Sequence, residues 1–511
     1  MTGSTHADGG APGLEADPPE HEVGGYGMRQ WIGWILGPAA LAATLILPAP
    51  AGLSEPGWHT AGAALLMATW WITETVPIPV TALLPLVLFP VLGLGDIRET
   101  AAPFANPIIF LFLGGFVIAL AMQKWGLHRR VAINLIGAMG TRPSHIVAGF
   151  LVASAGVSMW VSNTATALMM LPIALSVVQL LPAKRTPGQR QFATALLLAV
   201  AYGATTGGMA TLIGTPPNAL LAAFLETTYG QSIGFGQWML LGVPVMLVTL
   251  PVVFLVLTRV SFRLDAGELP GMRELIVEEK ARLGPVGRGE RIVMVVFILT
   301  ATAWVLQPLI AKSLPLVTDT TIAMTGALLL FFAPVDWRRG VFTMDWETAR
   351  DLPWEVLLLF GGGLSLAANI ERHGLSTYLG SLSDVLHGLP MLAILSAVCF
   401  GILLLTELTS NTATAATFLP ISAAIALSLG QNPLLFLIPT ALAANCSYML
   451  PVGTPPNAIV FGSGQVTLPQ MARAGMLLNV LLVPIIVGLV LLLGPWVFGV
   501  QFDVIPDWVK R

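Results

Sequence analysis

Two nearly identical stretches decide the fold of this chain: residues 162–174 read SNTATALMMLPIA, and residues 410–422 read SNTATAATFLPIS. Nine of the thirteen positions are identical, at an offset of 248 residues. The same offset aligns a Gly-Gly pair at 114–115 with another at 362–363. Because several landmarks recur in the same order, we predict an internal duplication.

A second motif follows each of these stretches: IGTPPNA occupies residues 213–219, and VGTPPNA occupies residues 452–458. Here the offset is 239 residues, so the second copy has lost nine residues between the two motifs. We therefore predict one repeat over residues 58–260 (repeat 1) and another over residues 291–499 (repeat 2).

Four further segments complete the predicted domain organisation. The N-terminal segment is rich in Gly, Pro, Asp and Glu, which cannot bury enough apolar surface to fold. The loop between the repeats carries one amphipathic helix, over residues 273–283. The segments are a disordered tail at 1–27, a first transmembrane helix at 28–57, a cytoplasmic connecting loop at 261–290 and a C-terminal tail at 500–511.

The composition places both repeats in a membrane. Of the 511 residues, 55% are hydrophobic and 10% are charged, and the mean hydropathy is +0.80. Soluble domains are about 25% charged, so the composition argues against soluble domains, a disordered chain and a nucleic-acid partner. Since a bilayer span needs about 20 apolar residues, we predict an all-α polytopic membrane protein with eleven transmembrane helices. The runs lie near residues 30–50, 58–74, 78–95, 107–123, 190–213, 236–258, 291–311, 318–335, 354–370, 434–452 and 474–499.

Two longer apolar stretches, 145–182 and 389–429, carry a Ser-Asn-Thr triplet in their middle, so each forms two spans or one re-entrant hairpin. Lys and Arg, which favour cytoplasmic loops, gather within residues 124–190, 259–291 and 338–339. If both stretches are re-entrant, these clusters share one side, with the N-terminus cytoplasmic and the C-terminus outside. Each repeat then has five spans, so the repeats are inverted, as is typical of secondary transporters.

The triplets at 162–164 and 410–412 predict an anion site. Ser and Asn favour helix N-caps and turns, so we place each triplet at a hairpin tip where a half-helix begins. Hydroxyls, a carboxamide and backbone N–H groups at the positive end of a helix bind anions. Ser and Thr also hold membrane helices together, which would be the simpler explanation for a single triplet. Two copies at mirrored positions favour binding.

The Gly-Thr-Pro-Pro-Asn motifs at 214–218 and 453–457 predict broken helices, because Pro lacks an N–H group and clashes with the preceding turn. The freed carbonyls need a partner inside a membrane, and such oxygens suit sodium. A simple proline kink is the alternative, which the repetition of all five residues disfavours. No Lys or Arg lies in any of the four motifs. Helix ends and co-bound cations must therefore balance a bound dianion, and linkage makes that effect reciprocal.

Two acidic residues, Glu74 and Glu407, lie in apolar surroundings, where ionisable residues are rare and often functional. Glu407 could carry a coupling proton. Its counterpart at the offset of 248 is Met159, so it belongs to no symmetric pair of ion sites, and we favour sodium as the coupling ion. Cys399 and Cys446 lie in apolar segments and indicate neither a disulfide nor a metal site.

The paired triplets and paired Gly-Thr-Pro-Pro-Asn motifs resemble those of the divalent-anion:sodium symporter (DASS) family, which includes INDY-type bacterial dicarboxylate transporters. The segment WITETVPIPVTALLP at 71–85 also resembles that family, and the likeness runs from about residue 30 to the C-terminus. The resemblance implies a homodimer in the bacterial inner membrane. In each subunit a transport domain would move against a scaffold domain as an elevator.

The resemblance also implies the ligands of the site. The substrate would meet Ser162, Asn163, Thr164, Thr215, Pro216, Ser410, Asn411, Thr412, Thr454 and Pro455. One sodium site would use Ser158, Asn163 and the backbone at Val161 and Gly214. Its mirror would use Thr406, Asn411 and the backbone at Thr409 and Gly453.

These inferences predict a secondary active transporter, and not an enzyme, that imports C4-dicarboxylates such as succinate, malate and fumarate together with sodium. Within transport, the alternatives are a sodium-independent divalent-anion exchanger and a sulfate carrier. The alternative from another class is a membrane sensor or enzyme. It has little support, because the sequence shows no nucleophile–base pair, no metal cluster and no output domain.

Overall fold

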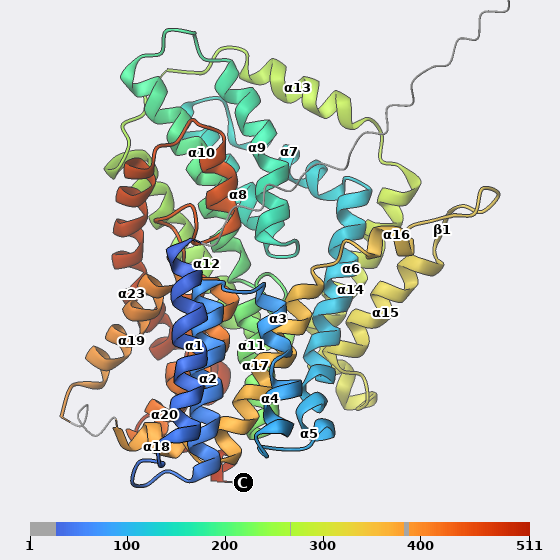
Figure 1. Cartoon of the computed structure of the whole chain (residues 1–511). Helices are drawn as coiled ribbons and strands as arrows, with labels where there is room; N and C mark the ends of the chain where they lie inside the picture. The colour runs from blue at the N-terminus through green and yellow to red at the C-terminus, as the bar shows by residue number, and fades with distance from the viewer. Residues whose placement is uncertain (1–26, 266, 383–387, 511) are drawn as a thin grey trace, which may run out of the picture.

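The computed structural model describes residues 27–265, 267–382 and 388–510. Within these ranges the regular secondary structure is helical except for one two-stranded sheet. All but the last residue of the predicted tail 1–27 lies outside the described residues. Figure 1 shows a bundle of helices in which α1 begins about halfway along the bundle and runs away from α13, and the chain finishes at the end opposite α13.

The first half of the bundle contains one pair of helices that turn back on each other, α8 and α9, and two helices that flank a break, α10 and α11. Its elements are α1 (Met28–Ile46), α2 (Glu55–Thr73), α3 (Ile78–Leu83), α4 (Pro85–Val91), α5 (Ile97–Ala101), η1 (Ala102–Ala105), α6 (Pro107–Lys124), α7 (Leu127–Met139), α8 (Pro143–Ser158), α9 (Asn163–Gln179), α10 (Pro187–Gly208), α11 (Pro216–Tyr229), α12 (Phe235–Leu255) and η2 (Val256–Val260).

The second half repeats this order after the connecting helix α13. Its hairpin pair is α19 and α20, and its broken pair is α21 and α22. The elements are α13 (Met272–Leu283), α14 (Arg288–Ser313), α15 (Asp319–Phe332), β1 (Pro334–Asp336), β2 (Val341–Phe342), α16 (Trp346–Ala349), α17 (Trp354–Arg372), α18 (Leu375–Leu382), α19 (Met391–Thr406), α20 (Asn411–Ser428), α21 (Leu434–Ala444), α22 (Pro455–Gly462), α23 (Leu468–Phe498) and η4 (Asp507–Lys510).

Helices occupy all eleven predicted apolar runs, but three runs contain a break. The run at 78–95 divides into α3 and α4 because Pro85 has no N–H group to bond back to the preceding turn. The runs at 190–213 and 434–452 stop being helical at Gly208 and Ala444, ahead of the Pro-Pro motifs. Among the described residues, four helical stretches are long and apolar enough to cross a membrane by themselves: Ile97–Lys124, Phe235–Val260, Arg288–Ser313 and Leu468–Phe498.

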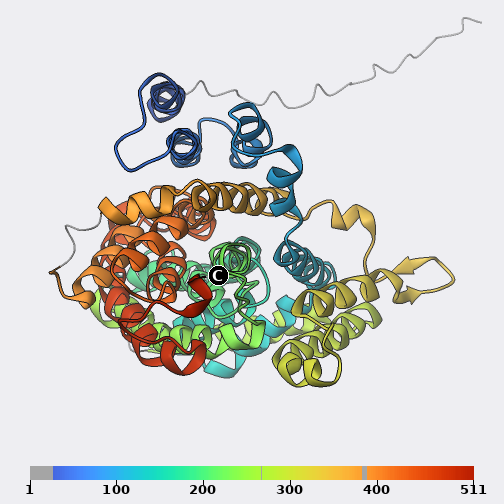
Figure 2. The same ribbon diagram turned by 90° about the horizontal axis from the view of Figure 1, so that it is seen from below.

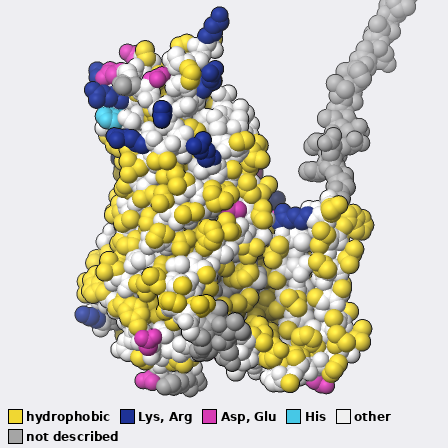
Figure 3. Space-filling model, turned by 90° about the vertical axis from the view of Figure 1, so that its left-hand side faces the viewer, with side chains coloured by type: hydrophobic (Ala, Val, Ile, Leu, Met, Phe, Trp, Pro, Cys, Tyr) yellow, Lys and Arg dark blue, Asp and Glu magenta, His cyan; other side chains and the backbone are white. Residues whose placement is uncertain are grey.

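The two hairpin pairs lie at opposite ends of the molecule, as inverted repeats require. Figure 1 places α8 and α9 toward the end that carries α13, and α18 to α20 toward the other end. Seen end on, α1 and α2 lie along one side of the bundle, and α17 lies between them and the interior (Figure 2). Figure 3 shows a broad belt of hydrophobic side chains on one face, with Lys and Arg gathered at one end above it.

Close packing between the repeats explains why a Gly-Gly pair occurs in each of them. A Cβ atom on Gly114 of α6 would lie 2.7 Å from the backbone of Ala323 in α15. A Cβ atom on Gly362 of α17 would lie 2.2 Å from the carbonyl oxygen of Ala82 in α3. Each repeat therefore presses its glycine helix against a helix of the other repeat, and only Gly permits the approach.

Arginines of the basic segment that follows α6 hold the connecting helix α13 in place. Arg129 pairs with Glu279 of α13 at 2.7 Å. Arg130 donates to Glu290 at the start of α14, at 3.0 Å from its Nη2, and to the carbonyl of Leu283 at the end of α13. The predicted amphipathic helix at 273–283 is thus confirmed, and it ties repeat 1 to the first helix of repeat 2.

Two details differ from the predicted pattern of helices and tails. Strands β1 and β2 form a small antiparallel hairpin in which Asp336 accepts hydrogen bonds from the backbone N–H groups of Arg338 and Arg339. The predicted tail at 500–511 packs against the bundle, because Asp503 accepts a 2.6 Å hydrogen bond from Gln431 and its N–H donates one back.

Candidate functional site

Each hairpin turns at its Ser-Asn-Thr triplet, as the sequence predicts. Helix α9 begins at Asn163, and the Oγ of its N-cap Ser162 accepts a 3.3 Å hydrogen bond from the N–H of Ala165. Helix α20 begins at Asn411, with Ser410 at the N-cap position but without a side-chain capping bond. The positive ends of two helices thus carry the two triplets.

A hydroxyl–carboxamide pair recurs at both hairpin tips. Ser158 Oγ donates to Asn163 Oδ1 at 2.6 Å. Thr406 Oγ1 lies 2.7 Å from one atom of the Asn411 carboxamide and donates to the carbonyl of Ala444 at 2.8 Å. Both hydroxyl residues are buried, and both end the first helix of their hairpin. The mirrored geometry shows that the two tips are built in the same way although their sequences are far apart in the chain.

The broken helices restart at the prolines with matching backbone geometry. Thr215 precedes α11 with φ −154° and ψ 142°, and Thr454 precedes α22 with φ −154° and ψ 144°. Neither threonine caps its helix through its side chain. Two copies of one unusual join are hard to reconcile with a simple kink, because a kink needs only a missing hydrogen bond.

The asparagines that close the Gly-Thr-Pro-Pro-Asn motifs satisfy carbonyls freed by the breaks. Asn218 Nδ2 donates to the carbonyls of Gly208 and Thr211, at 3.2 and 2.8 Å. Asn457 Nδ2 donates to the carbonyls of Ser447 and Leu450, at 3.3 and 3.1 Å. These acceptors stand at equivalent positions under the offset of 239. The predicted ligand set omits Asn218 and Asn457. Their repetition as the last residue of both Gly-Thr-Pro-Pro-Asn motifs could have pointed to them.

Oxygen atoms converge beside the tip of repeat 2. One atom of the Asn411 carboxamide lies 2.7 Å from Thr406 Oγ1. The same atom lies 3.2 Å from the carbonyl oxygen of Ala444 and 3.3 Å from the carbonyl oxygen of Gly453. If this atom is nitrogen, it donates to the carbonyls; if it is oxygen, a cation between the oxygens removes their repulsion. Ala444 was absent from the predicted set, since a backbone oxygen leaves no mark in sequence.

The corresponding place in repeat 1 is shaped by glycine. A Cβ atom on Gly208 would lie 2.6 Å from Asn163 Oδ1 and 3.2 Å from the carbonyl oxygen of Gly214. A Cβ atom on Gly214 would lie 2.6 Å from the carbonyl oxygen of Gly208. Two glycines therefore let a carboxamide and two backbone carbonyls come together without side chains between them.

Hydrogen bonds join the two broken helices at the centre of the molecule. Thr215 Oγ1 donates to Asn445 Oδ1 at 2.6 Å, and Asn445 Nδ2 donates to Asn218 Oδ1 at 2.9 Å. Thr206 and Tyr448 form a second link, at 3.0 Å between their hydroxyls. Helix α9 also packs on α22, and α20 packs on α11, so each hairpin contacts the other repeat.

The structure therefore brings all four motifs into one assembly. In repeat 1, Asn163 lies against Gly208, and Gly208 accepts a hydrogen bond from Asn218. Asn218 in turn accepts a hydrogen bond from Asn445 of repeat 2. The residue before Asn445, Ala444, accepts a hydrogen bond from Thr406 at the second hairpin tip. The predicted ligands Ser162, Asn163, Thr164, Pro216, Ser410 and Asn411 are half-buried, while Val161, Gly214, Thr215, Thr409, Thr412, Gly453 and Thr454 are buried and Pro455 is exposed.

The hydroxyl of Thr215, a predicted substrate ligand, and that of Thr409, predicted to contribute its backbone, both have partners within the protein. The Thr215 hydroxyl is used by Asn445. Thr409 Oγ1 lies 2.6 Å from Thr414 Oγ1, which leaves its backbone as the part that fits the predicted role.

The two halves of the assembly differ in exposure. In repeat 2, Leu408 at the hairpin tip is 58% exposed and Val452 ahead of the break is 70% exposed. The counterpart of Val452 in repeat 1, Ile213, is only 6% exposed. These residues of the repeat 2 tip and break are thus more exposed than Ile213 in repeat 1.

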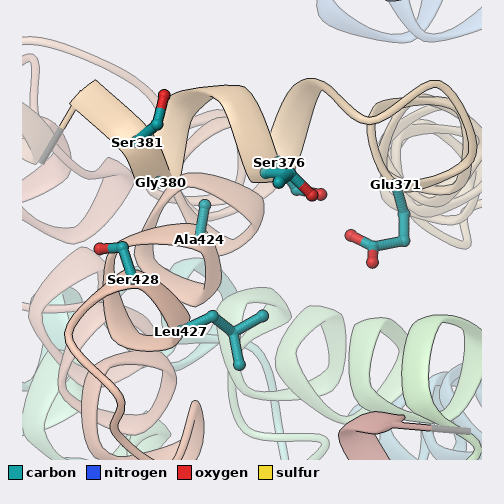
Figure 4. A pocket seen from close by; sticks show the side chains of 8 residues that line it. Glu371, Ser376, Gly380, Ser381, Ala424, Leu427 and Ser428 are labelled. Carbon is teal, nitrogen blue, oxygen red and sulfur yellow. The ribbon is translucent and has the colours of Figure 1, made fainter. Parts of the chain in front are cut away.

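A separate polar cavity of about 310 Å³ lies between α17, α18 and α20. Figure 4 shows Glu371, Ser376 and Ser428 around this space. Its α20 residues lie about 20 Å along the helix from Asn411, at a rise of about 1.5 Å per residue. The cavity is therefore not part of the assembly formed by the four motifs.

Inverted repeats that bring hairpin tips and broken helices together inside a polytopic helical bundle define a secondary transporter. The chain belongs to the sodium:sulfate symporter family, since the family model described as "Sodium:sulfate symporter transmembrane region" matches residues 28–500. The predicted family resemblance is confirmed, and the protein is a multi-pass membrane protein.

Named relatives give the same assignment. The chain is 42% identical over 485 residues to the sodium-dependent dicarboxylate transporter SdcS of Staphylococcus saprophyticus, with 93% of each chain covered. It is 41% identical over 488 residues to SdcS of Staphylococcus aureus strain MRSA252, with 94% of each chain covered.

Two solved structures share the fold at low sequence identity. The Alcanivorax borkumensis YdaH transporter aligns with a TM-score of 0.54 and 14% identity, over 86% of this chain and 98% of that one. MtrF of Neisseria gonorrhoeae aligns with a TM-score of 0.52 and 10% identity, over 94% of this chain and 96% of that one. Both likenesses support the predicted helical fold.

Proposed function

We propose that this protein is a secondary active transporter that carries C4-dicarboxylates such as succinate, malate and fumarate into the cell together with sodium. The observation that carries the proposal is the mirrored pair of hydroxyl–carboxamide contacts, Ser158–Asn163 and Thr406–Asn411. Each pair stands beside a broken helix that supplies carbonyl oxygens. The SdcS relatives, named as sodium-dependent dicarboxylate transporters, support the same substrate and ion.

The substrate dianion would lie between the two hairpin tips. Each triplet offers hydroxyls, a carboxamide and the N–H groups of a helix N-terminus, so each can receive one carboxylate. The substrate ligands proposed are Ser162, Asn163, Thr164, Ser410, Asn411 and Thr412, with Thr215, Pro216, Thr454 and Pro455 beside them. A pseudo-symmetric site suits a substrate with an anionic group at each end.

Sodium would be carried as a second substrate at two mirrored positions. The first would use Ser158 and Asn163 with the backbone of Val161 and Gly214. The second would use Thr406 and Asn411 with the backbone of Thr409 and Gly453, and the carbonyl of Ala444 joins this set because of its place in the oxygen cluster. Hydroxyl, carboxamide and carbonyl oxygens are the ligands that hard cations prefer.

The coupling follows from charge. The eight salt bridges among the described residues lie away from the four motifs, and the motifs contain no Lys or Arg. A bound dianion must therefore be balanced by helix ends and by sodium. Sodium strengthens substrate binding, and substrate strengthens sodium binding by the same factor. Proton coupling through Glu407 is not required by this scheme.

Transport would follow an elevator movement of the hairpins and broken helices against a scaffold, in a homodimer. The protein would lie in the bacterial plasma membrane with the N-terminus cytoplasmic and the C-terminus outside, because the end rich in Lys and Arg also carries α13.

Uptake of labelled succinate into proteoliposomes tests the proposal. We expect accumulation with an inward sodium gradient and little uptake when potassium replaces sodium. A Hill coefficient above one for sodium would indicate more than one coupled ion. Equal uptake without sodium would favour the exchanger, and inhibition of labelled sulfate uptake by sulfate but not by succinate would favour the sulfate carrier.

A further inference from the structure

The two repeats differ at many positions where hairpin tip and broken helix meet, and three of these differences change the hydrogen bonds between tip and break. Under the offsets of 248 and 239, Met159 corresponds to Glu407, Gly208 to Ser447 and Thr211 to Leu450. The hydroxyl–carboxamide contact at the tip and the asparagine bonds at the break are mirrored, so these three differences allow the two repeats to be compared.

In repeat 1 a threonine joins the broken helix to the hairpin tip. Thr211 Oγ1 donates to the carbonyl of Met159 at 2.6 Å and accepts from the N–H of Gly214 at 3.0 Å. Helix α10 continues to Gly208, so few backbone N–H groups are released before the motif. In this arrangement Met159 takes part through its backbone carbonyl, and its side chain is apolar.

In repeat 2 the helix ends three positions earlier, at Ala444, and frees a row of backbone N–H groups. Both carboxylate oxygens of Glu407 receive them. Hydrogen bonds reach Glu407 from the N–H groups of Tyr448 at 2.7 Å, Met449 at 2.9 and 3.0 Å, and Leu450 at 3.0 Å. Ser447 Oγ lies 3.0 Å away, and Asn479 Nδ2 of α23 donates at 2.8 Å.

Glu407 is thus a buried acceptor surrounded by donors. It is 2% exposed, and its hydrogen-bond partners among the described residues include no Lys, Arg or His. Backbone and amide donors can hold a carboxylate, yet they leave its net charge in place. The region next to Thr406 therefore carries a negative charge that the matching region of repeat 1 lacks.

The same carboxylate also fixes the backbone of the proposed second sodium site. Its neighbour in the chain is Thr406, and a Cβ atom on Gly453 would lie 3.0 Å from the Glu407 carbonyl oxygen and 2.0 Å from Ser447 Oγ. The carbonyls of Ala444 and Gly453 enclose the segment that Glu407 binds. Loss of the carboxylate would therefore release the segment that presents both carbonyls.

We infer that Glu407, with Ser447, is a positioning residue that makes the repeat 2 cation site the tighter of two non-equivalent sodium sites. The inference rests on the proposed function. Glu407 holds residues 447–450 against the hairpin tip, and its charge favours a cation nearby. In repeat 1 the corresponding link is the neutral hydroxyl of Thr211, so sodium binds the repeat 2 site at a lower concentration than the repeat 1 site.

Sodium binding to the substrate-free full-length protein in nanodiscs tests this inference without transport. Intrinsic fluorescence or isothermal calorimetry would follow sodium addition at constant ionic strength, with potassium as the replacement ion. We expect two unequal phases in wild type. In Glu407→Gln, whose amide group faces donors, we expect the tighter phase to weaken by about tenfold or more. The mirrored control Met159→Gln should change the tighter phase by less than about twofold.

Two further variants keep the test informative if Glu407→Gln folds poorly. Ser447→Gly removes one donor and restores the repeat 1 residue, and we expect an intermediate loss of affinity. The triple variant E407M/S447G/L450T transplants the repeat 1 solution, and we expect a stable protein whose two phases become similar. A tight phase unchanged in all three variants would overturn the inference, whereas a wild type without any sodium response would overturn the proposed function itself.

Discussion

The hydroxyl of Thr215 in repeat 1 donates a 2.6 Å hydrogen bond to the carboxamide oxygen of Asn445 in repeat 2. Asn445 returns a bond to Asn218 of repeat 1, and all three residues are buried. The two broken helices are therefore held together by side chains and not only by packing. A shift of one broken helix therefore alters the hydrogen bonds of the other. These bonds are a physical basis for coupling between the two halves of the site.

Replacing Asn445 by Ala should reduce both stability and sodium-dependent transport. The change leaves the buried groups of Thr215 and Asn218 without partners, at a cost of about 1–3 kcal/mol for each buried unsatisfied group. We expect a lower midpoint of thermal unfolding in detergent and a lower apparent affinity for succinate.

A matched control is Thr417→Val on α20. The Thr417 hydroxyl bonds only to the carbonyl of Ala413 in its own helix. It should change stability by less than about 1 kcal/mol and leave transport unchanged. An Asn445→Ala protein with wild-type unfolding and kinetics would show that the bridge is dispensable.

Removal of either tip carboxamide should weaken sodium and substrate together. Asn163→Ala removes the acceptor of the Ser158 hydroxyl, and Asn411→Ala removes the carboxamide that lies beside Thr406 and the Ala444 carbonyl. Because each Asn lies between the proposed sites, we expect at least about a fivefold loss of apparent affinity for both ligands. Succinate uptake measured across a matrix of sodium and succinate concentrations would detect it; loss of only one of the two affinities would contradict the shared role.

A methyl group at Gly208 should damage the repeat 1 cation site selectively. The added Cβ atom of Gly208→Ala would lie 2.6 Å from Asn163 Oδ1 and push the carboxamide aside, and overpacking of this kind costs about 1–3 kcal/mol. We expect weaker sodium dependence of uptake. Gly488→Ala is the control, because its Cβ atom meets nothing within 4 Å and Ala stabilises a helix interior by about 0.5–1 kcal/mol.

The ion pair between Lys124 and Asp345 should make part of the stability depend on acid pH. Hydrogen bonds from Lys124 and Thr348 lower the pKa of Asp345 from 3.8 to about 2. Since the pKa is lower in the folded state, this stabilisation is complete above about pH 4 and disappears as the pH falls toward 2. We expect Asp345→Asn to be less stable than wild type at pH 7 by a small amount, because the site is exposed. The difference in unfolding midpoint should vanish near pH 2, and a difference that persists there would assign it to another cause.

Repetition within one chain made the architecture accessible without coordinates. The 248-residue offset, the Pro-Pro breaks and the half-helices starting at Asn163 and Asn411 all follow from local rules, since Pro breaks helices and Ser-Asn favours N-caps. Apolar runs likewise predict helices wherever they occur. The breaks at Leu84 and Ala444 were harder to predict, because apolar content alone says nothing of where a helix ends inside its run.

The asymmetric features required the tertiary structure. Glu407 looked in sequence like a possible proton carrier, and only the fold shows that it receives the N–H groups of residues 448–450 and a side chain from α23. Ala444 contributes through its carbonyl oxygen, which every residue possesses and no sequence pattern distinguishes. Asn445 acts across the repeats, at a contact between residues more than two hundred positions apart.

Local and periodic features thus follow from the sequence: helical segments, their breaks, the duplication and the polar groups of the four motifs. Which groups of the two repeats touch, and that the surroundings of the two hairpin tips differ, follows only from the packing of the whole chain. The physical reason is that a hydrogen bond depends on distances of about 3 Å between atoms, and the chain brings such atoms together only when both repeats have packed.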